Sequence, residues 1–499
     1  MTRATVIGVD VGTTATKVVA YSPDGTAIGV AERGYPLHSP QPGWAEQDPD
    51  QIVAAVLDAV AEAAAAVPAR SLVAVGLGSA MHSLIGLDAD DRPLTPALTY
   101  ADSRSWPQAL RLRRERGLDL YHATGTPLHP MSPLAKLCWF AEEQPELFRR
   151  VRRWISVKEY LSGQLCGSTA VDHAIASATG MFNLRARDWD DEALSAAGVS
   201  VDQLGEPVPT TTVIGALPKV VAERLGVDAS TQVVIGASDG VLANLGVGAL
   251  RPGEASLSIG TSGAVRVATD QPTTDPDMRT FCYALLSERW VSGGAISNGG
   301  LVLRWLNEQI LGTPDLEGIT AEAAVVAPGS DGVLMVPYLT AERAPRWSPL
   351  HGAVLFGLHV EHRRGHVIRA ALEGVALQLR LVADAMRDGG ADLRQLRVTG
   401  GFVASDLWLQ IVADVLGSQL DVPSVEEPVA YGAALLALRG VELIDDLDNA
   451  TRQTGVARSV TPDENAARRY DGVAARYGDL VERLEPLLTD PAGWTPASN

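Results

Sequence analysis

The chain contains little lysine, with four residues in 499, namely Lys17, Lys136, Lys158 and Lys219. Against 41 Lys and Arg it carries 60 Asp and Glu, so its formal net charge is −19 at pH 7. This balance argues against binding to nucleic acid or to an anionic membrane surface, because both are themselves negatively charged. An anionic substrate would need a local group of cations, and two of the lysines, Lys17 and Lys136, fall in the motifs described below.

Cysteine is also scarce, and long apolar runs are missing. Cys138, Cys166 and Cys282 lie far apart and have neither a metal-binding nor a redox spacing, so we expect buried thiols in a reducing compartment. The N-terminus lacks a basic segment followed by an apolar stretch, and no apolar run reaches 18 residues. These absences predict a cytoplasmic protein without a membrane span. The oligomeric state does not follow from the sequence, which leaves a homodimer open.

The composition indicates a folded chain with large cores. Hydrophobic residues make up 46% and charged residues 20%, which excludes disorder as the global state. A length of 499 residues predicts more than one domain, and glycine becomes dense after residue 245. We therefore place a boundary near 245–255 and predict domains over 1–248 and 249–455, a helical tail over 456–499 and a disordered stub at the very end.

The stretch from Val6 to Tyr21 combines two apolar runs with a polar turn. This pattern predicts two strands of a hairpin. The turn and its flanks carry Asp10, a glycine, three threonines and Lys17. Glycine lets backbone N–H groups approach a phosphate closely, hydroxyl and ammonium groups add donors, and a carboxylate suits a hydrated divalent cation. A phosphate-binding turn and a hairpin with a merely polar tip are both compatible with this stretch alone.

The second half of the chain repeats this pattern, because strands predicted over 255–259 and 264–268 flank the Gly/Thr/Ser turn 260–263. In the first half, Asp48 as N-cap and Pro49 in the first turn predict the start of a helix. Two such halves suggest a duplicated fold with a mixed sheet flanked by helices and a nucleotide between them. Further strands are predicted over 26–31, 72–77, 233–236 and 396–399, and helices over 51–67, 366–386, 405–416 and 464–488.

Two longer motifs make a family resemblance specific. Residues 131–143 (MSPLAKLCWFAEE) and residues 353–358 (AVLFGL), followed by 366–373 (HVIRAALE), resemble the two signatures of the FGGY carbohydrate kinases. The resemblance implies an α/β, two-domain actin-like ATPase (ribonuclease H-like) fold with an interdomain cleft, which binds a sugar or sugar acid together with ATP and Mg²⁺. Within the family, residues 38–48, 80–84, 100–105 and 124–130 are most similar to bacterial gluconate kinases. Xylulokinases share the Met81–His82 pair, whereas glycerol kinases carry an Arg–Glu pair there.

The resemblance also implies roles for single residues. Asp239 is expected to hold the attacking hydroxyl, accept its proton late and lie close to the metal, unless it only caps the following helix. Asp10 is expected to bind Mg²⁺ through water. Lys17 could instead be a solvated surface lysine without a phosphate contact. Gly300 and Gly401 could instead be ordinary turn glycines without a nucleotide contact. The residues expected at the phosphates and the nucleotide are Gly12, Thr13, Thr14, Lys17, Gly260, Thr261, Gly300, Gly401 and Ser405.

The sugar is expected at Met81 and His82, which follow a strand end, although such a pair also occurs in ordinary packing. A carboxylate on the substrate calls for a cation, and the candidates are Arg104 first, then Lys136, His129 and Arg343. Each of these can instead form a structural ion pair. Asp102 either binds sugar hydroxyls or only orients Arg104. The resulting hypothesis is phosphorylation of D-gluconate to 6-phospho-D-gluconate, with a D-xylulose kinase and a non-catalytic sugar or nucleotide sensor as alternatives.

Overall fold

The structure is a computed structural model that describes residues 4–68, 71–312, 316–349, 352–452 and 454–488. The chain forms two compact units, each built from separate segments. Unit 1 contains Met1–Pro252, Ala268–Ser292 and Val425–Gly455, and unit 2 contains Gly253–Val267, Gly293–Ser424 and Val456–Asn499. The first division lies at Pro252, whereas the predicted domains 1–248, 249–455 and 456–499 group residues 268–292 and 425–455 differently. The terminal stub expected to be disordered lies outside the described residues.

Unit 1 is built on a six-stranded sheet with the order β13-β14-β5-β1-β2-β3. The predicted hairpin and the strand predicted over 26–31 form an antiparallel meander, while β5 and β14 run parallel to β1. Burial on both faces explains why β1 and β5 are nearly continuous apolar runs. The strand bounds are β1 Thr5–Val11, β2 Ala15–Tyr21, β3 Ala27–Gly34, β5 Leu72–Ser79, β13 Val213–Ala216 and β14 Gln232–Ser238.

Helix α1 (Pro49–Ala65) begins as the sequence predicts. The Asp48 side chain accepts hydrogen bonds from the backbone N–H groups of Asp50 and Gln51, and Pro49 occupies the first turn. These contacts satisfy two donors that a helix leaves unpaired at its N-terminus. The apolar face of α1, including Ile52 and Val56, is buried in the core that it shares with the first strands.

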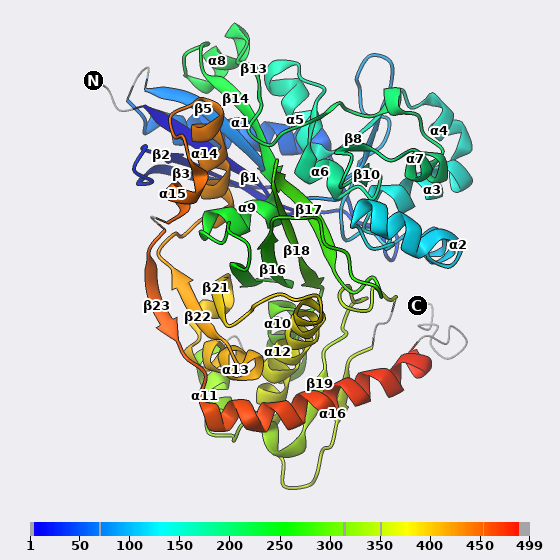
Figure 1. Ribbon diagram of the computed structural model, residues 1–499, viewed down its shortest axis with the longest axis vertical. Helices are drawn as coiled ribbons and strands as arrows, with labels where there is room; N and C mark the ends of the chain where they lie inside the picture. The colour runs from blue at the N-terminus through cyan, green and yellow to red at the C-terminus, as the bar shows by residue number, and fades with distance from the viewer. Residues whose placement is uncertain (1–3, 69–70, 313–315, 350–351, 453, 489–499) are drawn as a thin grey trace. The chain divides into compact units, whose positions relative to one another are not determined.

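Helix α14 (Pro428–Gly440) comes from late in the chain but packs on β1, β5 and β14 of unit 1 (Figure 1). Its backbone approaches the sheet so closely that glycine is required at two strand positions. A Cβ on Gly8 would lie 1.8 Å from the Ala430 carbonyl oxygen, and one on Gly76 would lie 2.2 Å from that of Ala433. The N-terminal end of α14 therefore lies in unit 1, as does the first hairpin.

The rest of unit 1 is helical with short two-stranded ladders. A separate apolar cluster around Leu137, Phe140 and Trp154 forms its core. Its helices are α2 Trp106–Thr124, α3 Pro133–Glu143, α4 Pro145–Arg150, α5 Val157–Cys166, α6 His173–Ser177, α7 Asp191–Ala197, α8 Lys219–Leu225, α9 Asp239–Gly246 and α15 Leu447–Thr451. The short strands are β4 Glu46–Gln47, β6 Ile85–Leu87, β7 Ala97–Leu98, β8 Arg153–Ile155, β9 Val171–Asp172, β10 Phe182–Asn183, β11 Asp188–Trp189 and β12 Pro207–Val208, and β17 covers Phe281–Leu286.

Unit 2 contains strands of a seven-stranded sheet with the order β17-β18-β16-β15-β21-β22-β23. The long helix α12 is buried along most of its length. Besides β17, the strands of this sheet are β15 Ala255–Ile259, β16 Gly263–Thr269, β18 Arg289–Ile296, β21 Gln395–Thr399, β22 Gln419–Pro423 and β23 Val456–Val460. Two further strands, β19 Leu334–Val336 and β20 Val354–Phe356, form a separate ladder. The helices are α10 Gly300–Trp305, α11 Leu316–Ala324, α12 Arg364–Asp388, α13 Asp406–Leu416 and α16 Glu464–Leu488.

The three cysteines are free thiols. Cys138 and Cys282 are buried as predicted, but Cys166 is only half-buried because it lies at the last turn of α5. Within the described ranges, every helix is too short or too polar to cross a membrane.

Candidate functional site

Three parallel strands of unit 1 end side by side and place the candidate residues at one edge of the sheet. Val11 pairs with Ser79, and Ser79 pairs with Ser238. The residues that follow these strand ends are therefore neighbours, and they include Gly12 and Asp239. Ligands of open α/β sheets bind at such carboxyl ends.

The turn after β1 is held by its carbonyl oxygens. The Tyr35 hydroxyl donates to the Gly12 oxygen at 2.5 Å, and the Tyr35 N–H donates to the Thr14 oxygen at 3.1 Å. The Gln47 amide donates to the Thr13 oxygen at 2.6 Å. Inside the turn, the Gly12 N–H donates to the Ala15 oxygen at 3.0 Å. Tyr35 and Gln47 thus hold the turn in place through its carbonyl oxygens.

Two acidic residues, Asp10 and Asp239, interact electrostatically at this edge. Asp10 Oδ1 is buried and lacks a hydrogen-bond partner among the described residues. Burial raises the pKa of Asp10 to about 8, and the charges of Asp239 and Glu427 add to this increase. A buried carboxylate oxygen without a partner fits a hydrated cation. Across the described ranges, however, three or more His, Cys, Asp or Glu side chains nowhere gather into a group able to hold a metal ion by themselves.

Asp239 occupies the first position of α9, and Ser238 is the N-cap residue, so the alternative that Asp239 is the N-cap is wrong by one position. Its Oδ1 accepts a hydrogen bond from the N–H of Gly240 at 2.7 Å. The side chain is half-buried. It therefore lies at the positive end of a short helix, where a carboxylate is stabilised.

Lys17 lies opposite Asp10 in the β1–β2 ladder. Its ammonium donates to Glu427 at 2.8 Å, and Glu32 lies 3.8 Å away. The hydrogen bond that Lys17 donates to Glu427 is the main reason why the pKa of Lys17 is raised. Lys17 is half-buried, and its contact with Glu427 occupies part of the ammonium. Its role at the phosphates stays a prediction.

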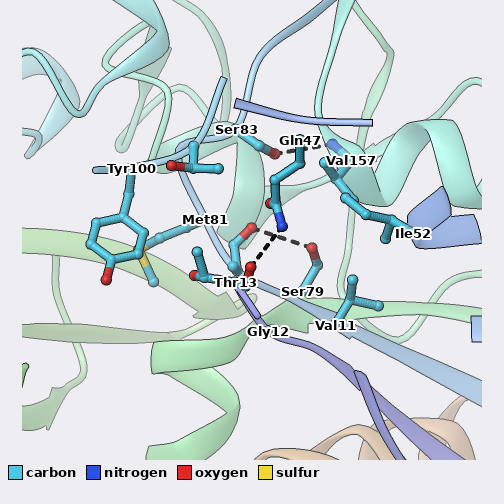
Figure 2. Close-up of a pocket in the computed structure, with 12 residues that line it drawn as sticks. Val11, Gly12, Thr13, Gln47, Ile52, Ser79, Met81, Ser83, Tyr100 and Val157 are labelled. Carbon is cyan, nitrogen blue, oxygen red and sulfur yellow. Dashed lines mark hydrogen bonds between the residues drawn. The ribbon is translucent and has the colours of Figure 1, made fainter. Parts of the chain in front are cut away.

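A pocket of unit 1 opens between the first turn and the Met81 loop (Figure 2). Figure 2 shows the Gln47 amide reaching toward Thr13, with Ser79 below it and Tyr100 beside Met81. Every lining side chain is uncharged, and several carry hydroxyl or amide groups. The lining residues are Val11, Gly12, Thr13, Gln47, Ile52, Ser79, Ala80, Met81, Ser83, Thr99, Tyr100 and Val157.

Met81 lines this pocket, whereas His82 is buried behind it with a left-handed backbone, φ 68°. Its Nδ1 lies 2.7 Å from the Ala178 carbonyl oxygen, so Nδ1 carries a proton. The Nε2 atom lies 3.4 Å from the Tyr283 hydroxyl. These contacts fix the ring plane and the tautomer of His82.

Lys136 is fully buried and donates to three backbone carbonyl oxygens. They belong to His82 at 2.6 Å, Thr99 at 2.7 Å and Met131 at 2.9 Å. Burial lowers the pKa of Lys136 to about 7, while the charge of Asp102 acts in the opposite direction. Three carbonyl partners use all three N–H groups of an ammonium. This geometry makes Lys136 a brace for the His82 and Thr99 backbones.

Arg104 and Asp102 form a buried pair. Arg104 donates to both oxygens of Asp102, at 2.9 and 2.7 Å, and to Glu46 at 2.6 Å. Its guanidinium lies 3.5 Å above the centre of the Trp44 ring. Asp102 therefore orients Arg104, which is one of the two roles predicted for it, and it also accepts from the N–H of Ala45 at 2.8 Å. The cluster fastens residues 44–46 to the loop at 102–104.

The other two candidate cations also have protein contacts. His129 is buried, packs edge-on against Trp106, and accepts at Nδ1 from the N–H of Met131 at 3.1 Å. Arg343 belongs to unit 2, where it donates to the carbonyl oxygen of Ile296 at 2.9 Å and to the hydroxyl of Ser297 at 3.3 Å. Neither side chain lines the unit 1 pocket.

In unit 2, the candidate nucleotide residues lie at adjacent strand ends. The turn after β15 is bonded to the start of α10, because Gly300 N–H donates to the Gly260 oxygen at 2.7 Å and Leu301 N–H to the Thr261 oxygen at 3.2 Å. Strand β21 runs parallel to β15 and leads to Gly401. The Ser405 hydroxyl caps α13 by accepting from the N–H of Trp408 at 3.3 Å.

Three residues at the unit 1 site were missed in the sequence. Glu427 binds Lys17, Gln47 binds the first turn, and Tyr283 contacts His82. Only Gln47 had a signal that could have been used, because it lies in the stretch 38–48 that carries part of the resemblance. Glu427 and Tyr283 come from segments far along the chain.

Residues 5–246 match the N-terminal domain, and residues 255–441 the C-terminal domain, of the FGGY family of carbohydrate kinases. A gluconokinase of Bacillus subtilis (strain 168) is 40% identical over 98% of both chains. The crystal structure of gluconate kinase from Lactobacillus acidophilus matches with a TM-score of 0.92 and 32% identity, covering 97% of this chain and 98% of that one. A ligand-bound xylulose kinase from the same organism matches with the same TM-score, 31% identity and the same coverage.

Proposed function

Because the chain belongs to the FGGY family of carbohydrate kinases, we propose that it phosphorylates D-gluconate with ATP to give 6-phospho-D-gluconate and ADP. The observation that carries the choice of substrate is the 40% identity to a gluconokinase over nearly the whole of both chains. In this reaction a gluconate hydroxyl oxygen bonds to the γ-phosphorus, the bond from that phosphorus to the β–γ bridging oxygen breaks, and the hydroxyl proton leaves.

Asp239 is proposed to hold that hydroxyl. Phosphoryl transfer has a loose transition state, so the enzyme mainly positions the reactants and balances charge. A carboxylate is too weak a base to deprotonate an alcohol in advance, but it can orient the hydroxyl and accept its proton late. The position of Asp239 at a strand end, within electrostatic reach of Asp10, supports this role.

Asp10 is proposed to hold Mg²⁺ through water, and Asp239 lies near enough to contribute charge. The buried Oδ1 atom without a partner supports this assignment. When bound, Mg²⁺ supplies positive charge that offsets the phosphate oxygens during transfer. Asp10 must lose a proton before it can hold Mg²⁺ near pH 7, because its pKa is about 8.

For ATP, unit 1 is proposed to contribute Gly12, Thr13, Thr14 and Lys17. Unit 2 is proposed to contribute Gly260, Thr261, Gly300 and Gly401. Residues 12–14, Gly260 and Thr261 lie on turns that follow strand ends, whereas Lys17 lies on β2 and Gly300 begins α10. Turns of this kind can bind an anion through backbone N–H groups. Ser405 is a weaker proposal, since its hydroxyl already caps α13.

The unit 1 pocket is proposed to take the polyol part of the sugar acid. Its hydroxyl and amide groups suit substrate hydroxyls, and Met81 covers an apolar wall. The substrate carboxylate is not matched by any side chain that lines this pocket. Arg104, Lys136, His129 and Arg343 therefore stay predictions as carboxylate ligands, and each already has protein partners.

D-Xylulose is the second candidate, and the uncharged pocket lining favours it, because xylulose has no carboxylate. The similarity to a xylulose kinase structure at 31% identity supports the same reading. Because gluconate is charged and xylulose is neutral, a site built for one should turn over the other poorly. A comparison of turnover with the two sugars therefore separates the candidates.

The test is release of ADP with purified protein, Mg²⁺ and ATP in the presence of gluconate, xylulose, glycerol, ribulose or erythritol. The proposal expects the highest kcat/KM with gluconate. Turnover of xylulose without turnover of gluconate would replace the substrate. Absence of turnover with all five, together with measurable sugar binding, would favour the non-catalytic sensor.

A further inference from the structure

Gln47 connects the pocket of unit 1 to the turn after β1. It belongs to the short strand β4, whose partner is β7, and its side chain is only 4% exposed. The same side chain lines the pocket and donates from Nε2 to the Thr13 carbonyl oxygen at 2.6 Å. Figure 2 shows its amide end beside Thr13 and Ser79.

The bond to Thr13 fixes the direction of a peptide group. In a trans peptide the carbonyl oxygen and the next N–H point in opposite directions. Because the Thr13 oxygen points at Gln47, the N–H of Thr14 points away from residues 35–47. Tyr35 holds the neighbouring carbonyls of Gly12 and Thr14 in the same manner.

The Gln47 side chain also lines the pocket, and its chemical character suits contact with a sugar hydroxyl there. A glutamine amide is neutral and offers both donors and an acceptor. It can therefore bind the hydroxyl of a polyol in the pocket while one N–H remains on Thr13. A charged side chain at this position would have to be desolvated without a partner of opposite charge, because the pocket lining is uncharged.

We propose that Gln47 is a positioning residue that couples the polyol pocket to the phosphate-binding turn. A hydroxyl of the acceptor sugar adds a second hydrogen bond to the Gln47 amide. This bond strengthens the hold of the amide on the Thr13–Thr14 peptide, whose N–H is available to a phosphate. Acceptor and nucleotide then strengthen each other's binding. This inference rests on the proposed kinase function, since it needs both ligands to bind unit 1.

The experiment measures that coupling by calorimetry on the full chain. The Kd of a non-hydrolysable Mg²⁺–ATP analogue is determined with and without saturating D-gluconate. Coupling between two sites is commonly 5-fold to 150-fold in Kd, and we expect gluconate to tighten analogue binding at least ~5-fold. In Gln47→Glu, which keeps the shape but cannot donate, and in Gln47→Met, the factor should fall below ~2-fold.

The matched control is Gln51→Glu. Gln51 is exposed on α1, four residues away, and its amide contacts only the Asp48 cap. It should keep the wild-type coupling factor. Full coupling in Gln47→Glu, or its absence in the wild type, would overturn the inference.

A second measurement does not depend on any variant. Gluconate alone should slow amide hydrogen exchange at residues 12–15, because it strengthens the hold of the Gln47 amide on the turn before nucleotide binds. Unchanged exchange at saturating gluconate contradicts the inference. A failure of the proposed substrate looks different, because ADP release then occurs with another sugar, and that sugar replaces gluconate in both measurements.

Discussion

Lys17 Nζ and Glu427 Oε1 lie 2.8 Å apart, although 410 positions separate the two residues in the chain. The contact joins the first hairpin to the N-terminal end of α14. It also keeps the ammonium beside Asp10, whose own charge contributes to the raised pKa of Lys17. The turn proposed to bind phosphate therefore has a cation whose position depends on a residue near the end of the sequence.

The first prediction concerns this pair. Lys17→Met should raise the Kd of Mg²⁺–ATP about 10-fold, equivalent to about 1.4 kcal/mol, because a phosphate contact is lost. Glu427→Gln should change the Kd in the opposite direction, since it removes a negative charge and releases the lysine. Calorimetric titration measures both, with Lys219→Met as the control, because Lys219 is 86% exposed in its side chain. Equal affinities in all three variants would remove Lys17 from the site.

The second prediction concerns Asp10 and protons. With a pKa of about 8, Asp10 is protonated at pH 7 and must release its proton when Mg²⁺ binds. Binding of Mg²⁺–ATP at pH 7 should therefore release close to one proton from the wild type and none from Asp10→Asn. Calorimetry in two buffers of different ionisation enthalpy gives the proton count. An identical count in both proteins would contradict the assignment.

The same pKa has a consequence for stability. The folded protein keeps a proton on Asp10 that the unfolded chain loses above about pH 4, so this residue lowers stability increasingly as the pH rises from about 4 to 8. Asp10→Asn should raise the Tm of the ligand-free protein at pH 8 and leave it nearly unchanged at pH 4. Thermal unfolding at the two pH values, without Mg²⁺, provides the measurement. A lower Tm at pH 8 would contradict the sign.

Local patterns made much of the fold predictable. The meander, the strand–turn–strand repeat after residue 255 and the start of α1 at Asp48 all follow from signals within a few residues. The two-domain actin-like ATPase fold followed from the family motifs, and it is confirmed by the match to the gluconate kinase structure. The placement of α14 on the first sheet could not be predicted from local patterns, because only the paired glycines at Gly8 and Gly76 hint at the close contact.

The candidate site was less predictable, for a physical reason. A sequence identifies which side chains carry charge but not which partners neutralise them. Arg104 and Lys136 were candidates for binding a carboxylate, yet Arg104 is held by Asp102 and Glu46, and Lys136 is held by three carbonyl oxygens. Asp102 and Met131 are close in the sequence, but Glu46, His82 and Thr99 come from distant segments. The charge available to a ligand therefore depends on the tertiary structure.

The third prediction tests the proton acceptor. Asp239→Asn keeps the shape of the side chain but cannot accept a proton, so kcat should fall at least ~10²-fold while the Kd of ATP changes little. Steady-state ADP release and calorimetry give the two values. Asp119→Asn, an exposed substitution on α2, should leave kcat unchanged. Near-normal turnover of Asp239→Asn would assign proton transfer to another group.

The fourth prediction concerns Lys136, whose three N–H groups hold the carbonyls of His82, Thr99 and Met131. Lys136→Met fills a similar volume but leaves three buried acceptors unpaired, and each unpaired buried group costs about 1 to 3 kcal/mol. Since part of that cost is relieved by relaxation, we expect the free energy of unfolding to fall by about 3 kcal/mol. Urea unfolding measures the change, and Lys219→Met on the surface should shift it by less than about 0.5 kcal/mol.

Stability alone does not distinguish a brace from a carboxylate ligand, but the substrate dependence of Lys136→Met does. A lysine that contacts the substrate carboxylate would make the variant lose affinity for gluconate far more than for a neutral sugar such as xylulose. A brace of the His82 and Thr99 backbones should weaken both to a similar extent, because those backbones shape the pocket for any polyol. We expect parallel increases in KM for the two sugars. A selective increase for gluconate would place the ammonium on the substrate, and the three carbonyl contacts would then have to open when gluconate binds.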